Sequence, residues 1–449
     1  MENNLHSLQF GLAGQVITPE KPVFMHGYGD RTHKSEGAYA DIWAKAVLLV
    51  ANTRLLLVTI DALGSDRSFV VGIKDALQEK FGLQHEQVLI NFSHTHGAVY
   101  LTGTNTELRK GGYSIGQHAW AGREEELDYT EDEHFYTYVK ESILSLVDTC
   151  SRQLEEGELL IGRASSDFGV SRRKPKGDGV EWAPYYEGEI DKDLFVLQLA
   201  DSKGEVKGIL YNYGCHTTAR GSTYLISGDF SGKTSEYLES AYPGVMAMFL
   251  QGCGGEIKPR KSAAGDGFKN CNFEEMDEVG TDLAKEVMAI LENSPFTPVN
   301  CNFEAKLQDA MLLLEHTPIE QFMQMKDDPD LSDFERKAAE RTIQAIENGT
   351  IKESLPLYIL GWKLDEATRI IAIEGEVSTQ YALMIKKLYG NDRTLVLGYS
   401  NGVFCYIPTR QMIREGGYEA ECNYFFGLSG PFVPEIEDVI MAEVVKAGL

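Results

Sequence analysis

The sequence predicts an α/β fold of layered α+β type, with mixed β-sheets flanked by helices. Short apolar runs typical of buried strands alternate with longer amphipathic stretches typical of helices. No repeat, low-complexity tract or Pro/Gly/Ser-rich linker divides the 449 residues, although that length would permit about three domains. The candidate functional residues are spread over most of the chain, which favours one large domain over residues 1–449.

The expected strands are short apolar segments. Residues 46–50 and 55–60 flank a turn at Asn52-Thr53. Further buried strands are expected at 88–92, 195–199, 208–213 and 245–250.

The expected helices are longer and amphipathic. Over 66–81, apolar side chains from Val70 to Phe81 share one helical face, and Ser65 or Asp66 is a suitable N-cap. Other helices are expected at about 132–154, 231–240, 274–293, 377–389 and 435–447. Residues 317–350 are charged and amphipathic, with Pro329 between two helices, and are predicted to be a helical insertion, either a solvated hairpin or a lid.

Composition narrows the class of protein. Lys plus Arg is 42 and Asp plus Glu is 68, so the net charge is −26 and counts against nucleic acid or an anionic membrane as main partner. Hydrophobic residues are 43% of the chain, which excludes global disorder. No apolar run approaches the roughly 18 residues of a spanning helix. We therefore expect a small-molecule substrate and no stable membrane association. The composition does not indicate an oligomeric state.

Cysteine usage and the first residues predict the compartment. Seven cysteines without CxxC pairs are typical of reduced thiols. The first six residues have neither a basic nor an apolar region, so no signal peptide is expected. Both observations favour a cytoplasmic location.

Chemically capable residues follow the predicted strands, where open α/β sheets place their sites. His94 and His96 come after strand 88–92, and His216 follows strand 208–213. Glu376 lies between a strand and a helix, and Tyr406 lies in a glycine-rich loop segment. Each has an ordinary alternative: loop or core histidines, a helix cap, and a packing tyrosine.

Several common signatures are missing from the sequence. There is no Walker loop, no strand–GxGxxG–helix fingerprint, no Gly-x-Ser-x-Gly elbow and no His-Glu-x-x-His. The glycine-rich run at 252–255 instead allows the backbone to approach a ligand closely.

Taken together and in order, the motifs resemble the neutral, non-lysosomal ceramidases, zinc-dependent amidases that cleave the N-acyl bond of ceramide. The resemblance runs from about residue 9 to 430, over that family's catalytic domain. It is carried by these segments: FGLAGQVITPEKPVFMHGYG, YADIWAKAVLL, VTIDALG, SHTHG, SRRKP, DKDLFVLQLAD, GCHTT, IEGEVST and GYSNGVFCYIPT followed by GGYE.

The resemblance implies four ligands of a catalytic Zn²⁺: His94, His216, Glu376 and Tyr406. It also implies three groups around the reacting carbonyl: His96, Arg173 and Tyr418. Imidazole and carboxylate ligands suit Zn²⁺, whereas a tyrosine ligand must lose or share its proton.

One departure from the family pattern concerns the catalytic serine. The family's Gly-Asp-Val-Ser-Pro segment matches Gly255-Glu-Ile-Lys-Pro259, which places Lys258 at the serine position. A serine-bound intermediate is therefore not expected. Lys258 is a charge stabiliser, a binder of a substrate anion, or a partly solvated surface lysine.

Three functions remain open at this point. The first is a zinc-dependent hydrolase in which metal-activated water attacks an amide or ester bond of a small polar or acylated substrate. The second is a metal enzyme with other chemistry, glycoside cleavage or lyase action, using Asp229 and Glu256 as acid and base. The third is a non-catalytic binding protein.

Overall fold

The computed structural model describes residues 7–102, 127–390 and 392–448. Residues 1–6, where no signal peptide is expected, lie outside this range. The largest element is a mixed nine-stranded sheet of order β14-β12-β11-β8-β1-β3-β4-β6, with β18 pairing with β8. Its strands are β1 (Leu8–Val16), β3 (Trp43–Val50), β4 (Arg54–Ile60), β6 (Val88–Phe92), β8 (Glu155–Ser165), β11 (Asp193–Asp201), β12 (Val206–Tyr213), β14 (Met246–Gln251) and β18 (Thr297–Pro298).

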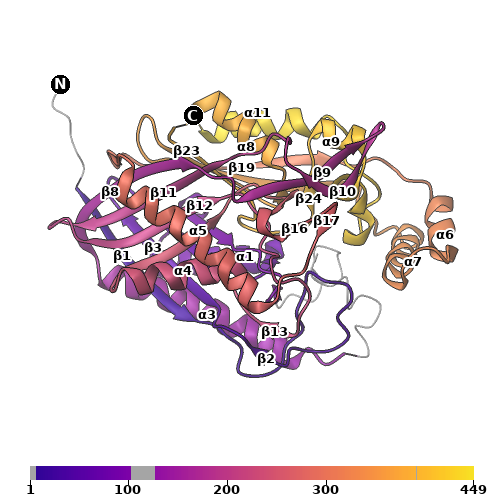
Figure 1. Cartoon of the computed structure of the whole chain (residues 1–449), viewed down its shortest axis with the longest axis horizontal. Coiled ribbons are helices and arrows are strands. Elements are labelled where there is room, and N and C mark those ends of the chain that lie inside the picture. The colour runs from indigo at the N-terminus through magenta and orange to yellow at the C-terminus, as the bar shows by residue number, and fades with distance from the viewer. Residues whose placement is uncertain (1–6, 103–126, 391, 449) are drawn as a thin grey trace.

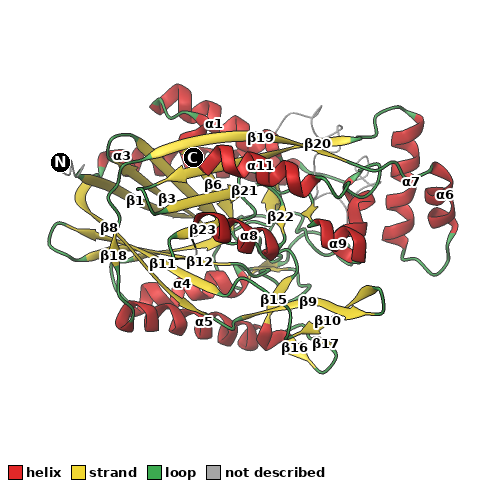
Figure 2. Ribbon diagram, turned by 90° about the horizontal axis from the view of Figure 1, so that it is seen from above, coloured by secondary structure: helices red, strands yellow, loops and turns green. Residues whose placement is uncertain are grey.

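A four-stranded sheet packs on one face of the large sheet (Figure 2). It consists of β19 (Glu304–Leu313), β20 (Ser354–Lys363), β21 (Arg369–Ile373) and β23 (Thr394–Leu397). Buried side chains of both sheets, including Leu57, Phe195, Trp362 and Leu397, form one hydrophobic cluster. Because strand side chains alternate between faces, Leu56 and Val58 belong to a different cluster, on the opposite face.

Helices cover the outer faces of both sheets. On the large sheet, α1 (Arg67–Phe81) and α3 (Thr130–Arg152) pack on one half, and α4 (Asp229–Ala241) and α5 (Phe273–Asn293) pack on the other. On the four-stranded sheet lie α8 (Thr379–Tyr389) and α11 (Ile436–Gly448). The predicted α/β class, with mixed sheets flanked by helices, is confirmed.

Of the two N-caps predicted for the first helix, Ser65 and Asp66, the structure has Asp66, whose side chain accepts a hydrogen bond from the backbone N–H of Phe69. At the start of α8, by contrast, the cap is Ser378. Glu376 lies two residues earlier, so its carboxylate is not used as the helix cap.

Two further helices, α6 (Ile319–Asp327) and α7 (Asp333–Glu347), connect β19 to β20 and project at one end of the molecule (Figure 1). Pro329 lies between them, as the sequence predicts. Phe334 of α7 packs on Phe425, with the two ring centroids 4.9 Å apart.

Short elements complete the described structure. The strands are β2 (Gly37–Ala38), β5 (Gly64–Ser65), β7 (Tyr100–Leu101), β9 (Gly169–Lys176), β10 (Gly179–Tyr185), β13 (Leu225–Ile226), β15 (Ile257–Pro259), β16 (Ala263–Ala264), β17 (Gly267–Phe268), β22 (Glu376–Val377) and β24 (Tyr406–Ile407). The short helices are η1 (His85–Gln87), η3 (Arg260–Ser262), α9 (Arg410–Glu415), α10 (Tyr418–Glu421) and η4 (Cys422–Phe426). Within the described ranges, no helix is long and apolar enough to cross a membrane.

The side chain of Asn91 joins the two edge strands of the large sheet to the small sheet. Its Oδ1 accepts from the backbone N–H of Gln251 at the end of β14 (2.8 Å). Its Nδ2 donates to the backbone oxygens of Gln251 (3.3 Å) and Gly398 (3.0 Å) and to Ser400 Oγ (3.0 Å). The loops that follow β6, β14 and β23 therefore all begin next to the Asn91 side chain.

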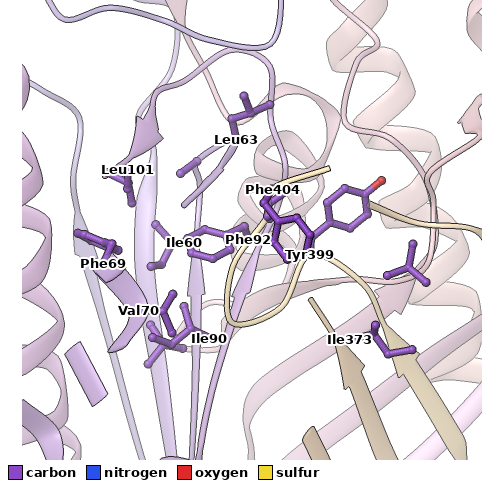
Figure 3. Packing of buried hydrophobic residues seen from close by; sticks show 14 of the residues in the cluster. Ile60, Leu63, Phe69, Val70, Ile90, Phe92, Leu101, Ile373, Tyr399 and Phe404 are labelled. Carbon is purple, nitrogen blue, oxygen red and sulfur yellow. The ribbon is translucent and has the colours of Figure 1, made fainter. Parts of the chain in front are cut away.

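Apolar packing supports the same junction. Tyr399 and Phe404, from the loop after β23, lie beside Phe92 and belong to the same hydrophobic cluster as Ile60 and Ile373 (Figure 3). All of these side chains are buried, so the loop is anchored in the core of the protein.

Candidate metal centre

Four loops meet where β6, β12 and the small sheet end. His94 follows β6, and His216 follows β12. Glu376 and Tyr406 lie on the parallel pair β22–β24, where they are direct register partners. Because partners in a parallel register project to the same side, the pairing aims both side chains at the histidines.

The side-chain atoms converge closely. His94 Nε2 lies 3.1 Å from His216 Nε2 and 3.2 Å from His96 Nε2. Glu376 Oε2 lies 3.3 Å from His94 Nε2 and 3.2 Å from His216 Nε2. The Tyr406 hydroxyl is 3.5 Å from His216 Nε2. The structure thus brings together all four residues that the resemblance implied as ligands, with His96 beside them.

The hydrogen bonds behind the rings show that this cluster fits a cation. His94 Nδ1 lies 2.5 Å from the Leu63 carbonyl oxygen, and His216 Nδ1 lies 3.0 Å from that of Gly254. A carbonyl oxygen can only accept, so each Nδ1 carries a proton and each neutral ring presents a lone pair at Nε2. Two such lone pairs face a buried Glu376 oxygen that has no hydrogen-bond donor. They repel one another unless a cation lies between them, and the donor set suits Zn²⁺.

Burial keeps the centre in this protonation state. It lowers the pKa of His216 to about 4. Burial, together with the adjacent His94 and His216 rings, holds the pKa of His96 well below its usual value. Burial would raise the pKa of Glu376, but His94 and His216 outweigh it and hold that pKa well below normal. His96 and His216 are therefore neutral imidazoles and Glu376 is a carboxylate, the forms that bind metal.

Tyr406 differs from these groups. Burial and the nearby Glu376 carboxylate raise the pKa of its phenol well above the usual value. Without a cation the phenol keeps its proton, so its use as a ligand depends on the positive charge of a metal.

Strained backbone supports the centre. His94 adopts φ 57°, and Tyr399 and Asn401 adopt φ 50° and 58°, values that residues other than glycine rarely take. Gly27 adopts φ 96°, and a Cβ there would meet His96 Nδ1 at 2.5 Å. Such strain persists where surrounding packing holds it, and it is common at functional sites.

Tyr399 is a neighbour of the centre that sequence reasoning missed. Its ring lies 4.4 Å from the His94 ring, and its hydroxyl is 3.3 Å from His216 Nδ1. The signal available in the sequence was its place in the Gly398-Tyr-Ser-Asn loop. Of the tyrosines in and after this loop, only Tyr406 and Tyr418 are predicted as site residues.

The arginine that reaches the Tyr406 hydroxyl is Arg172, the chain neighbour of the predicted Arg173. Arg172 Nη2 donates to the Tyr406 hydroxyl (3.2 Å) and its Nε donates to Glu419 (2.7 Å). Arg173 instead donates to Glu419 (2.8 Å), Glu415 (3.3 Å) and the Gly416 carbonyl (2.8 Å). Adjacent residues of β9 leave the strand in different directions, so the SRRKP motif could not decide between them.

The other two predicted catalytic residues, Tyr418 and Lys258, contact Tyr406 and Thr218 respectively. The Tyr418 ring is 5.5 Å from that of Tyr406 and is 44% exposed, next to Trp182 at 5.5 Å. Lys258 Nζ donates to Thr218 Oγ1 at 3.0 Å. Burial, and to a smaller extent the positive charge of Arg172, lower the pKa of Lys258 to about 8.

The two acids considered for glycoside or lyase chemistry are occupied by other groups. Asp229 accepts backbone N–H bonds from Ala219, Arg220 and Phe230. Glu256 accepts from Ser378 Oγ and from the backbone of α8. Both carboxylates therefore hold the backbone around the centre.

The fold and the cluster define a mixed α/β protein with a group of three histidines, two buried and one partly buried, that could hold a metal ion. Residues 10–289 match the family model described as neutral/alkaline non-lysosomal ceramidase, N-terminal, and the chain belongs to this family.

A curated neutral ceramidase of Pseudomonas aeruginosa is 25% identical over 292 residues, which is 61% of this chain and 40% of that protein. The match thus spans less than half of the relative's length. The crystal structure of neutral ceramidase from Pseudomonas aeruginosa has a TM-score of 0.71 at 18% identity, covering 99% of this chain and 75% of that one. A ceramidase complexed with C2 has a TM-score of 0.71 at 17% identity, covering 99% and 76%. These structures share the fold.

Proposed function

We propose that this chain is a zinc-dependent hydrolase that cleaves an amide or ester bond of a small polar or acylated substrate. The observation that carries the proposal is the convergence of His94, His216 and Glu376, whose metal-binding atoms face one another within 3.3 Å. Membership of the ceramidase family supports amide cleavage.

His94, His216, Glu376 and Tyr406 would hold the ion. Zn²⁺ in such a site supplies a Lewis acid for the carbonyl and lowers the pKa of water. The unpaired Nδ1 of His96 leaves that ring free to accept or pass a proton.

The charged and phenolic groups around the centre stabilise the negative charge that develops on the carbonyl oxygen. Arg172 is held by Glu419 and reaches Tyr406, so its positive charge is fixed in place before reaction. Tyr418 at the exposed rim can donate a hydrogen bond to the substrate. We assign Arg173 to positioning Glu419.

We also propose that residues 1–449 form one catalytic domain, because the centre draws on both sheets. Its residues come from positions as distant as 94 and 419, so any single domain that holds the centre spans most of the chain.

Metal analysis is the first test. Protein purified without chelator should contain close to one zinc per chain, and less than about one-tenth would overturn the proposal. His94→Ala and His216→Ala should lose the metal and the activity. His85→Ala, at a histidine paired with Asp75 on the surface, is the matched control.

Activity is then measured on an amide, ester and glycoside panel that includes ceramide and short N-acyl amines. Hydrolysis of an amide or ester by wild type and by His85→Ala, but not by the other two variants, is the expected result. Activity confined to the glycosides would contradict the proposed bond type.

A further inference from the structure

Lys258 carries a positive charge that the described part of the protein leaves without a counter-ion. It forms no ion pair with any described carboxylate, and within the described residues its ammonium donates a hydrogen bond to Thr218. The carboxylate that interacts with it electrostatically, that of Asp229, has its oxygens occupied by three backbone donors. A partly buried ammonium without a partner is costly, unless a ligand supplies the opposite charge.

The strand register places this charge beside the metal centre. The backbone N–H of Arg172 bonds to the Glu256 carbonyl, and Lys258 is two residues further along the same strand segment. Residues two apart share a face, so Lys258 and Arg172 project to the same side of this small sheet. The residue before Lys258 contacts a proposed metal ligand: the Ile257 carbonyl accepts a hydrogen bond from the backbone N–H of His216. Thr218, the partner of Lys258, is two residues beyond that histidine.

The neighbours of Lys258 indicate the chemistry of a ligand. The ammonium has three N–H donors, of which Thr218 accepts one, and two remain for the two oxygens of a carboxylate. The guanidinium of Arg172 is already held by Glu419 and Tyr406, so Lys258 is the available cation on this face. The single unpaired charge of Lys258 matches a ligand with one carboxylate. A ligand with a protonated amine is disfavoured, because Lys258 and Arg172 would both repel it.

We propose that Lys258 and Thr218 form a carboxylate-binding subsite next to the metal centre, so that the substrate is an acylated compound with a carboxylate near the scissile bond. This inference rests on the proposed function, because it places the subsite within the same active site. It assigns the substrate class, which the metal ligands alone do not.

The test uses pairs of metal-binding probes that differ only in charge. Malonyl, succinyl and adipoyl monohydroxamates are each compared with their methyl esters by calorimetric titration of the zinc-loaded full-length protein. Both members of a pair can bind zinc, and only the free acid has the carboxylate. The three lengths allow for the span between metal and ammonium. Charge-assisted hydrogen bonds are about twice as strong as neutral ones, so at least one acid should bind about tenfold more tightly than its ester.

The variants assign any preference to Lys258. In Lys258→Met the acid-to-ester ratio should fall to within about twofold, whereas Lys258→Arg should keep a preference. Lys261→Met is the matched control, since Lys261 lies on the adjacent η3 and pairs with Glu278 and Asp282. That control should keep the full ratio.

The outcomes separate the two proposals. Equal binding of every acid and ester, or a preference unchanged in Lys258→Met, overturns the subsite and leaves the metal centre intact. Acid binding that needs Lys258 but not zinc supports the subsite and counts against the hydrolase mechanism. Absence of binding by all probes counts against both.

Discussion

Glu419 is predicted to hold two buried arginines in place, and replacing it with glutamine tests this. The Glu419 side chain is 1% exposed, and those of Arg172 and Arg173 are 3% and 7% exposed. Its two oxygens accept from Arg172 at 2.7 Å and from Arg173 at 2.8 Å. Glu419→Gln keeps the shape of the side chain and removes the charge that both guanidiniums face.

The magnitude follows from burial. Removing one partner of a buried ion pair costs about 3–5 kcal/mol, because the other charge is left uncompensated. Arg173 retains Glu415 at 3.3 Å, which offsets part of the loss. We therefore expect Glu419→Gln to lower the free energy of unfolding by about 3 kcal/mol at pH 7.

Urea unfolding of the metal-free protein, followed by circular dichroism, measures this loss. The control is Glu181→Gln, which removes a surface pair with Lys176 whose side chains are 34% and 70% exposed. Exposed pairs contribute about 0–1 kcal/mol, so the control should change little. A Glu419→Gln loss no larger than the control's would refute the reasoning.

The same variant has a pH signature. Arg172 and Arg173 hold the pKa of Glu419 below its usual value of 4.5, against the opposing effect of burial. The folded state therefore binds this proton less readily than the unfolded chain does. The stabilisation is present above about pH 4.5 and is lost as pH falls through the lower folded-state pKa. The difference between wild type and Glu419→Gln should shrink correspondingly in acid.

Three other predictions concern the hydrogen bonds of Asn91, the stability of the protein in acid and the removal of the metal. Asn91→Ala leaves the buried backbone N–H of Gln251 unpaired and removes the donor to the Gly398 carbonyl, so it should cost about 3 kcal/mol in urea unfolding, whereas Asn293→Ala on a helix surface should cost under about 0.5. Burial, aided by Arg31, lowers the pKa of His26 to about 3; His26 should therefore contribute up to about 1.4 kcal/mol per pH unit to the loss of stability below pH 6.5, and the slope should be shallower by that contribution in His26→Gln. Chelation should lower the thermal midpoint of wild type and leave that of His94→Ala unchanged; equal shifts in both would place the metal elsewhere.

The sequence by itself was sufficient to predict the layered α/β class and its main elements. The apolar runs at residues 55–60 and 88–92 correctly predict β4 and β6, because strands that are buried on both faces need apolar side chains throughout. Asp66 capped α1 because a side-chain oxygen can satisfy the first free N–H groups locally. The ordered motifs also identified the family, and they named the four residues that converge.

Only the tertiary structure decided which neighbours those residues have. The choice between Arg172 and Arg173 depends on strand register, which adjacent identical residues cannot reveal. The approach of Tyr399 to His94, and of Lys258 to Thr218, depends on loops from separate sheets meeting at Asn91. Local sequence sets helices, strands and caps through short-range sterics and hydrogen bonds. The charges and lone pairs that face one another in the centre are set by long-range packing.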